Sequence, residues 1–153
     1  MVVSDVDVMA ALLGDAEVMR FYTAPKSREE AAAWIAWNQQ NYLDYGHGLW
    51  IIETLDGEFV GDCGLTWQEV NGTPELEVGY HVKAALHGQG YATEAATACL
   101  SYAREHTDAD KLVAIVHPEN RVSSRVAEKI GMHRVADDHG GNIAVRHVLS
   151  MRL

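Results

Sequence analysis

The chain has 153 residues, of which 48% are apolar, a share that suits one compact domain with its own hydrophobic core. The formal net charge of -10 disfavours binding to nucleic acid or anionic lipid, and it favours cationic amines as partners or serves solubility alone. No apolar run is long enough to span a membrane, and residues 1–5 lack the basic residues of a signal peptide, so we expect a cytoplasmic protein.

The cysteines and histidines do not form a recognisable metal site. The eight histidines include no pair with the spacing of zinc ligands, and the sequence has no Cys-x-x-Cys. Cys63 lies in a strand-like run and Cys99 in a helix-like run, so we predict free thiols that pack in the core. We therefore predict no metal.

Helical signals dominate the first third of the chain. Residues 5–22 carry an apolar stripe at helical spacing, interrupted near Gly14. Ser27 followed three residues later by Glu30 is typical of a capping box. This pattern predicts a second helix that runs to about Tyr45 and ends at a glycine.

Three strands joined by two tight turns should follow. We expect the strands at 49–55, 58–69 and 75–82, with Asp56-Gly57 and Asn71-Gly72 as the turns. In the third strand, apolar and polar residues alternate with a period of two, so one face should be polar. That polar face carries Glu75, Glu77, Gly79 and His81.

The second half of the chain alternates strands with helices. A helix is expected at 90–106, a strand covered on both faces at 112–116, and a short helix at 120–130. The segments 133–137 and 143–153 read as a closing hairpin. The order of elements predicts an α/β (α+β) layered domain with helices around a sheet.

The turn at 87–92 joins the third strand to the following helix and contains Gly88 and Gly90. The first N–H groups of a helix lack intrahelical partners, and glycines let a phosphate approach them. Thr93 stands where a dinucleotide fingerprint needs glycine, and no Gly-Lys-Ser/Thr follows, so the turn is neither a Rossmann motif nor a P-loop. By itself, the pattern fits an anion site or a plain structural turn.

The flanking residues favour the anion site. The segment His87-Gly88-Gln89-Gly90-Tyr91-Ala92 resembles the acetyl-CoA signature Gln/Arg-x-x-Gly-x-Gly/Ala of the GNAT superfamily of N-acetyltransferases, with His87 in place of Gln or Arg. Three further segments resemble the RimJ/RimL-like branch, which acetylates the N-termini of ribosomal proteins. These are Asp15 to Phe21, Glu77-Val78-Gly79-Tyr80, and Asn120-x-x-Ser123 with its Glu128-Lys129-Ile130-Gly131 continuation.

This resemblance covers nearly the whole chain and implies a GNAT-like, mixed but largely antiparallel sheet of about six strands flanked by helices. It implies that strands 75–82 and 111–117 splay apart and that the pantetheine of acetyl-CoA, the cosubstrate, lies between them. The main chain at His81 and Val82 would pair with pantetheine, and Asn120 would reach it from the other side. The pyrophosphate would bind the N–H groups of His87, Gly88, Gln89, Gly90, Tyr91 and Ala92.

The implied reaction is direct attack of a primary amine on acetyl-CoA in a ternary complex. Glu77, which shares the polar strand face with His81, is our candidate base, and a solvated strand residue is the alternative. The tyrosine acid of many relatives falls at Ala127, so Ser123 is our candidate for assisting the thiolate. Alternatively, Asn120 only caps its helix, with Ser123 in the first turn. A protein N-terminus and a small-molecule amine remain open as acceptors.

One departure concerns the start of the domain. The related branch opens with a strand of Arg-Leu-x-Leu-Arg type, and no such pattern precedes Val6. We therefore expect a single domain over 1–153 that lacks this first strand, with an open sheet edge that favours a homodimer. Together with His87 and Ala127, this departure leaves a non-catalytic acyl-CoA-binding or regulatory module as the alternative function.

Overall fold

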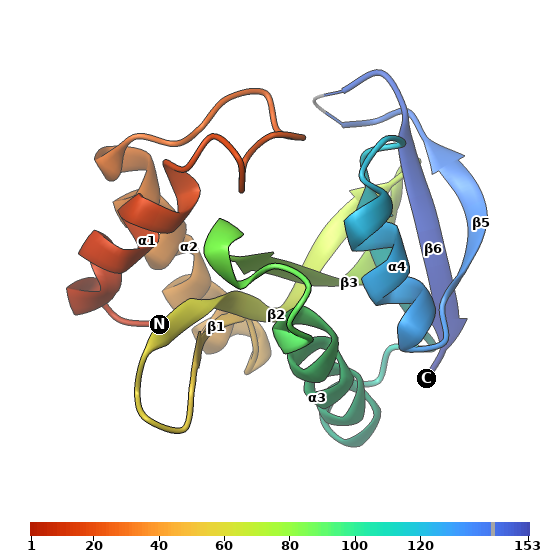
Figure 1. Ribbon diagram of the computed structural model, residues 1–153. Helices are drawn as coiled ribbons and strands as arrows, with labels where there is room; N and C mark the ends of the chain where they lie inside the picture. The colour runs from red at the N-terminus through yellow and green to blue at the C-terminus, as the bar shows by residue number, and fades with distance from the viewer. Residues whose placement is uncertain (142) are drawn as a thin grey trace.

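The computed structural model describes residues 1–141 and 143–153, which form one six-stranded sheet with helices on both faces (Figure 1). After a short 3-10 turn at Val3–Asp5, the helices are α1 Val6–Leu13, α2 Arg28–Tyr45, α3 Tyr91–His106 and α4 Arg121–Lys129. The strands are β1 Leu49–Glu53, β2 Phe59–Val70, β3 Thr73–Val82, β4 Lys111–Val116, β5 His133–Asp138 and β6 Arg146–Arg152. No helix in the described part of the chain is long and apolar enough to cross a membrane.

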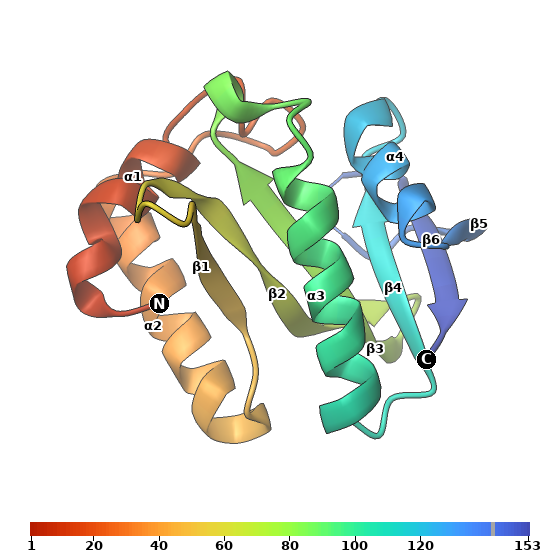
Figure 2. The same ribbon diagram turned by 60° about the horizontal axis from the view of Figure 1, so that its bottom comes forward.

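The sheet confirms the predicted mixed and largely antiparallel architecture. Its strand order is β1-β2-β3-β4-β6-β5, and β3 and β4 form its one parallel pair. Along β4 and β6, the pairing is continuous from Lys111 to Val116. Between β3 and β4, it is confined to Leu76 with Leu112 and Glu77 with Val113. Beyond Glu77 the two strands diverge, which confirms the expected splay (Figure 2).

The capping box forms as predicted at the start of α2. The Ser27 hydroxyl accepts from the Glu30 N–H at 3.2 Å, and the Ser27 N–H donates to the Glu30 carboxylate at 2.7 Å. Gly46, with φ of 76°, ends the helix in the left-handed conformation. The predicted helix at 5–22 is shorter than expected, because α1 ends at Leu13 and turns occupy the residues that follow.

The Asn71-Gly72 turn sets the register of the β2–β3 hairpin. Both residues have positive φ, 48° and 81°, as a two-residue hairpin turn requires. Val70 therefore pairs with Thr73, and the same register places Asp62 opposite His81. Side chains that face each other across a strand pair lie on one face of the sheet, so this turn brings two distant polar residues together.

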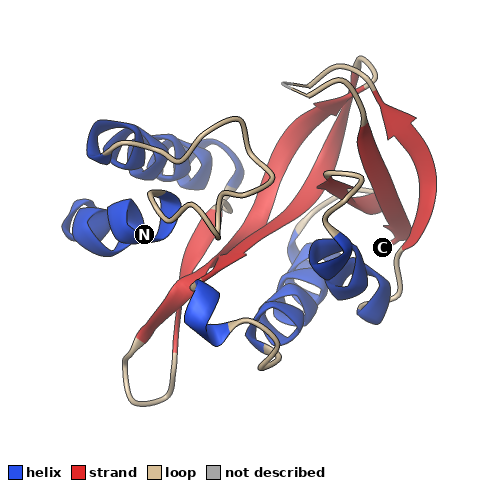
Figure 3. Ribbon diagram, turned by 45° about the horizontal axis from the view of Figure 1, so that its top comes forward, coloured by secondary structure: helices blue, strands red, loops and turns tan. Residues whose placement is uncertain are grey.

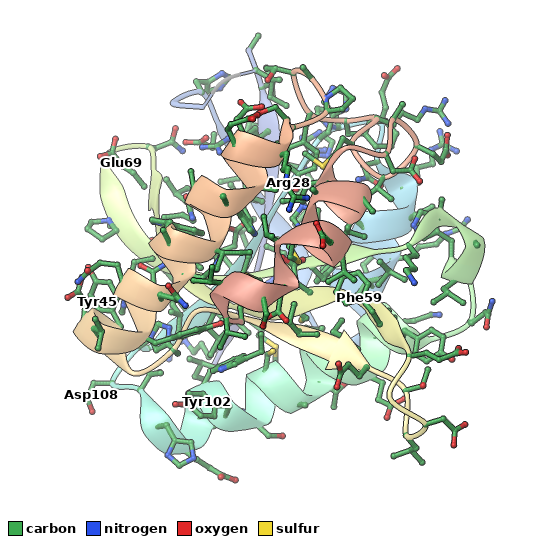
Figure 4. All side chains as sticks on the ribbon, turned by 90° about the vertical axis from the view of Figure 1, so that its left-hand side faces the viewer. Arg28, Tyr45, Phe59, Glu69, Tyr102 and Asp108 are labelled. Carbon is green, nitrogen blue, oxygen red and sulfur yellow. The ribbon has the colours of Figure 1, made fainter. Side chains whose placement is uncertain are left out.

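The helices divide between the two faces of the sheet (Figure 3). The apolar sides of α1 and α2 pack on Ile51 and Phe59, whereas α3 and α4 cover the opposite face. That opposite face holds the larger core, which includes both cysteines with their sulfurs 3.6 Å apart as buried free thiols. Viewed from the face that α1 and α2 cover, these two helices lie in front of the sheet, with Arg28 at the start of α2 and Tyr45 at its end (Figure 4).

Candidate active site

A cavity of about 430 Å³ opens where β3 and β4 separate. Its walls come from the segment between α1 and α2, the middle of α2, the start of β1, part of β2, both diverging strands, the start of α4 and the start of β6. Four residues that the sequence singled out line this one cavity: Glu77, His81, Asn120 and Ser123. The fold therefore gathers the candidate base, the candidate thiolate partner and the motif asparagine at a single site.

Glu77 lies at the point where the strands begin to separate. Its carboxylate accepts a hydrogen bond from the Ile115 N–H across the gap at 3.3 Å. Burial raises the pKa of Glu77 to about 7, and the Ile115 N–H, Arg146 and His81 oppose this rise. A carboxyl group with a pKa near neutrality can gain and lose a proton under physiological conditions, as a general base must.

The main chain of His81 does not face the gap, contrary to the expectation. The Lys83 N–H donates to the Val60 carbonyl at 2.9 Å, and hydrogen-bonded pairs alternate along an antiparallel ladder. His81 therefore exchanges its main-chain bonds with Asp62 on β2. Val82, together with Val78 and Tyr80, presents its main chain toward β4 instead.

The side chain of His81 belongs to a hydrogen-bonded chain that the sequence analysis missed. Its Nδ1 lies 2.7 Å from the Asp62 carboxylate, and its Nε2 lies 2.7 Å from the Tyr22 hydroxyl. Asp62 is completely buried, and its second oxygen accepts from the Trp34 indole at 3.2 Å. The Asn71 turn signal could have revealed the Asp62–His81 pair, whereas no local pattern places Tyr22, which is 59 positions from His81 in the chain.

The first turn of α4 is held by its capping residue, Asn120, and by Tyr80 on β3. Asn120 caps the helix, because its side-chain oxygen accepts from the Ser123 N–H at 3.1 Å. The Tyr80 hydroxyl donates to the Ser123 carbonyl at 2.8 Å. A phenol from β3 therefore contacts this helix, although Ala127 stands where many relatives have a tyrosine. Ser123 lines the cavity, and its hydroxyl makes no hydrogen bond to the described residues.

The turn before α3 has the expected form of an anion site. Gly90 is the N-cap with φ of 96°, and Gly88 has φ of 76°. Among residues 1–141 and 143–153, the N–H groups from Gly88 to Thr93 find no acceptor. His87 differs: its N–H donates to Ala84 at 3.2 Å and its ring donates to Val82 at 2.8 Å, so it holds the turn in shape.

Comparison with known proteins gives a consistent picture. The family model described as an acetyltransferase (GNAT) domain matches residues 1–133. An uncharacterized protein of Bacillus subtilis, YkkB, is 42% identical over 123 residues, which cover 80% of this chain and 72% of YkkB. An acetyltransferase from Agrobacterium tumefaciens superposes with a TM-score of 0.83 at 24% identity, covering 100% of this chain and 88% of the other. The structure of yncA from Salmonella typhimurium with its cofactor acetyl-CoA superposes with a TM-score of 0.76 at 17% identity, covering 100% and 91%.

Proposed function

We infer the reaction from the premise that this chain belongs to the GNAT family of acetyltransferases. Acetyl-CoA is accordingly its acetyl donor. We propose that the acceptor is a primary amine and that the amine attacks the thioester directly in a ternary complex. The observation that carries this proposal is the position of Glu77, a carboxyl group with a pKa of about 7 in the wall of the cavity where β3 and β4 part.

The proposed cofactor site uses the free N–H groups of the turn before α3 together with polar groups on both sides of the splay. The N–H groups from Gly88 to Ala92 would hold the pyrophosphate at the positive end of α3. Pantetheine would lie beside Val82, and the amide nitrogen of Asn120 would reach it from α4, since only its oxygen is used for capping. This placement brings the thioester into the cavity that contains Glu77.

In the proposed reaction, Glu77 takes a proton from the attacking nitrogen as the new C–N bond forms. The nitrogen becomes positively charged as it bonds to the carbonyl carbon, so a base that removes a proton at this point accelerates the step. The tetrahedral intermediate then expels CoA, and the Ser123 hydroxyl hydrogen-bonds to the departing sulfur. Ser123 is suited to this role because it lines the cavity and its hydroxyl has no hydrogen-bond partner among the described residues.

The test is release of CoA by the purified protein, measured with acetyl-CoA and a panel of amines. The panel contains peptides with free N-termini, arylalkyl amines, polyamines and amino sugars, and mass spectrometry identifies the N-acetylated product. Tight acetyl-CoA binding without turnover on any amine would instead support the non-catalytic acyl-CoA-binding module, which the replacement of the usual acid by Ala127 favours.

Replacement of Gly90 by alanine is expected to weaken acetyl-CoA binding by about tenfold or more. A side chain at this left-handed position is strained by about 1 kcal/mol, and it stands among the N–H groups that would bind phosphate. Isothermal titration calorimetry with CoA measures the effect. Gly57→Ala is the matched control, because Gly57 has a similar φ of 83° in the distant β1–β2 turn. Equal affinities of the two variants would contradict the placement of the pyrophosphate.

The outer edge of β1 has no neighbouring strand among the described residues. At Leu49 this edge is covered by α2, because the Leu49 N–H donates to Asn38 and the Leu49 carbonyl accepts from Tyr42. We propose that two copies of the chain pair along the rest of the edge, around Ile51, because an open edge presents unpaired N–H and carbonyl groups. Sedimentation equilibrium tests the homodimer. Proline at Ile51, in the middle of β1, would then shift the protein to monomer, whereas an unchanged mass would exclude pairing at this edge.

A further inference from the structure

Transfer of an acetyl group to an amine requires two protons to leave the nitrogen. At neutral pH an alkylamine is an ammonium ion, which must lose one proton before it can attack. The second proton leaves as the amide forms, and one of the two finally resides on the CoA sulfur. Glu77, beside the position proposed for the thioester, serves the second transfer, so the first requires another acceptor.

We propose that Tyr22, His81 and Asp62 form a proton relay that removes the first proton from the acceptor ammonium and returns it to solvent. This inference rests on the proposed function, since it assigns an additional step of that reaction. Tyr22 is the member that would contact the substrate, whereas His81 and Asp62 act through it.

The acceptor-only chemistry of a carboxylate sets the direction of the relay. An ionised Asp62 can only accept, so the Nδ1 of His81 carries the hydrogen and donates to it. The Nε2 of a neutral His81 is then left as the acceptor of the Tyr22 hydroxyl, at 2.7 Å. In this arrangement the Tyr22 oxygen keeps its lone pairs free to receive a proton from another molecule.

Burial decreases along the relay from Asp62 to Tyr22, so its inner end is protected and its outer end is accessible to a substrate. Asp62 is 0% exposed and His81 is 7% exposed, whereas Tyr22 is 50% exposed and lines the cavity. The inner pair is thus shielded from water, and Tyr22 brings the chain of hydrogen bonds to the cavity wall, where burial raises the pKa of its hydroxyl. The Trp34 indole occupies the second oxygen of Asp62, which holds the carboxylate in the orientation that His81 requires.

The charged groups around His81 are compatible with this role. Asp62 contacts the imidazole, Glu77 lies on the same face of β3, and Lys26 lies over the Trp34 ring at 5.4 Å. Of these three groups, Asp62 is the one within hydrogen-bonding distance of the His81 ring in the described structure. Its negative charge would therefore balance the positive charge of a protonated imidazole.

Protons and charges balance in the proposed step. An N–H bond of the ammonium breaks and its proton forms a new O–H bond with Tyr22, while the former Tyr22 proton moves to the Nε2 of His81. The products are a neutral amine and an imidazolium paired with Asp62. The imidazolium later returns its proton through Tyr22 to water, which regenerates the relay.

Two nearly isosteric amines separate this step from the remaining chemistry. Phenethylamine is a strong base and is an ammonium ion at neutral pH, whereas O-benzylhydroxylamine has an oxygen in place of one methylene and is already neutral. Only phenethylamine needs the relay. The aromatic side chains in the cavity wall, including Phe21, Trp34 and Trp37, suit the phenyl group of both compounds.

The experiment compares kcat/KM for the two amines in wild type, Tyr22→Phe and Asp62→Asn. We expect Tyr22→Phe to lower the value for phenethylamine by about 10²-fold and to leave the oxyamine nearly unchanged. Asp62→Asn should show the same selectivity, because a neutral amide stabilises the imidazolium less. The KM for acetyl-CoA should stay the same in both variants.

Tyr102→Phe is the matched control. It removes a phenol on α3 (Figure 4) that donates to the Gly46 carbonyl at 3.0 Å, and Tyr102 is not among the residues that line the cavity. Equal losses on both amines, or no loss on phenethylamine, would overturn the relay while leaving amine acetylation intact. Failure of wild type to acetylate either compound or any panel amine would remove the proposed function, and the relay with it. Tyr22 is half-exposed in a loop, so its variant should fold normally, which a thermal melt verifies.

Discussion

Replacement of Glu77 by glutamine is expected to lower kcat by about 10²- to 10⁴-fold while leaving the KM for acetyl-CoA unchanged. Glutamine keeps the oxygen that accepts from Ile115 but cannot take a proton. The measurement is a pH series of acetyl transfer. Because a base must be ionised, wild-type activity should fall as the pH drops below about 7, the pKa of Glu77, and this limb should be missing in the variant.

The same substitution should increase stability at neutral pH. The pKa of Glu77 is higher in the folded state than in the unfolded state, so ionisation of this carboxyl group destabilises the fold. This destabilisation is fully present above pH 7 and disappears as the pH falls toward 4. Glutamine avoids that cost, and we expect a gain of about 2 kcal/mol in the free energy of unfolding at pH 8. Urea unfolding measures it.

Glu75→Gln provides the control for both effects. Glu75 lies on the same face of β3 but outside the cavity, where it forms an ion pair with Lys111 at 2.7 Å. Its replacement should leave kcat unchanged and should not stabilise the protein. If Glu77→Gln retained full activity, the assignment of Glu77 as base would be wrong. A loss of activity accompanied by a loss of stability would indicate a structural role instead.

Replacement of Asp138 by asparagine is expected to lower the free energy of unfolding by about 3 kcal/mol. The side chain of Asp138 is completely buried, accepts from the Asn71 N–H at 2.8 Å, and forms an ion pair with Arg146. It therefore ties the β2–β3 turn to the hairpin that carries Arg146 into the cavity wall. An asparagine leaves the guanidinium partly buried without a countercharge.

Acid unfolding gives an independent measure of Asp138. Burial alone would raise the pKa of Asp138, but the Asn71 N–H and Arg146 outweigh it and hold the pKa below its ordinary value. The stabilisation is therefore present at neutral pH and is lost as the pH falls below about 4. The variant should lose less stability than wild type over that acid range. Asp137→Asn is the control, because Asp137 is exposed and pairs with Arg134 at the surface; an equal loss in both variants would contradict the buried-pair interpretation.

Local sequence signals predicted most of the fold. The Ser27 capping box, the Asn71-Gly72 turn and the small-residue helix at 90–106 appear in the structure with bounds close to those expected. These signals succeed because each depends on the conformation of a few neighbouring residues. The short α1 is the exception, since its apolar stripe continues to residue 22 although the helix ends at Leu13.

The candidate site was only partly predictable, because its geometry depends on contacts between distant segments. Glu77 and His81 were placed on one polar face by their spacing, and the cavity contains both. The hydrogen-bonded pairs of the β2–β3 ladder determine whether a given main-chain group on β3 faces β2 or β4. The alternation of polar and apolar residues in a strand does not show which pairs are hydrogen-bonded. Tyr22 comes from an irregular segment whose path is determined only by its packing.

The splay also determines how the two halves of the sheet are joined. The two halves of the sheet, β1-β2-β3 and β4-β6-β5, share hydrogen bonds over a very short stretch, whereas the apolar core beneath them contains residues of both halves, such as Leu65 and Leu149. The two halves are thus joined mainly by close-packed side chains and not by a continuous ladder of main-chain hydrogen bonds. The ladder between them ends at Glu77, and the carboxylate at that junction is the one on which we expect turnover to depend.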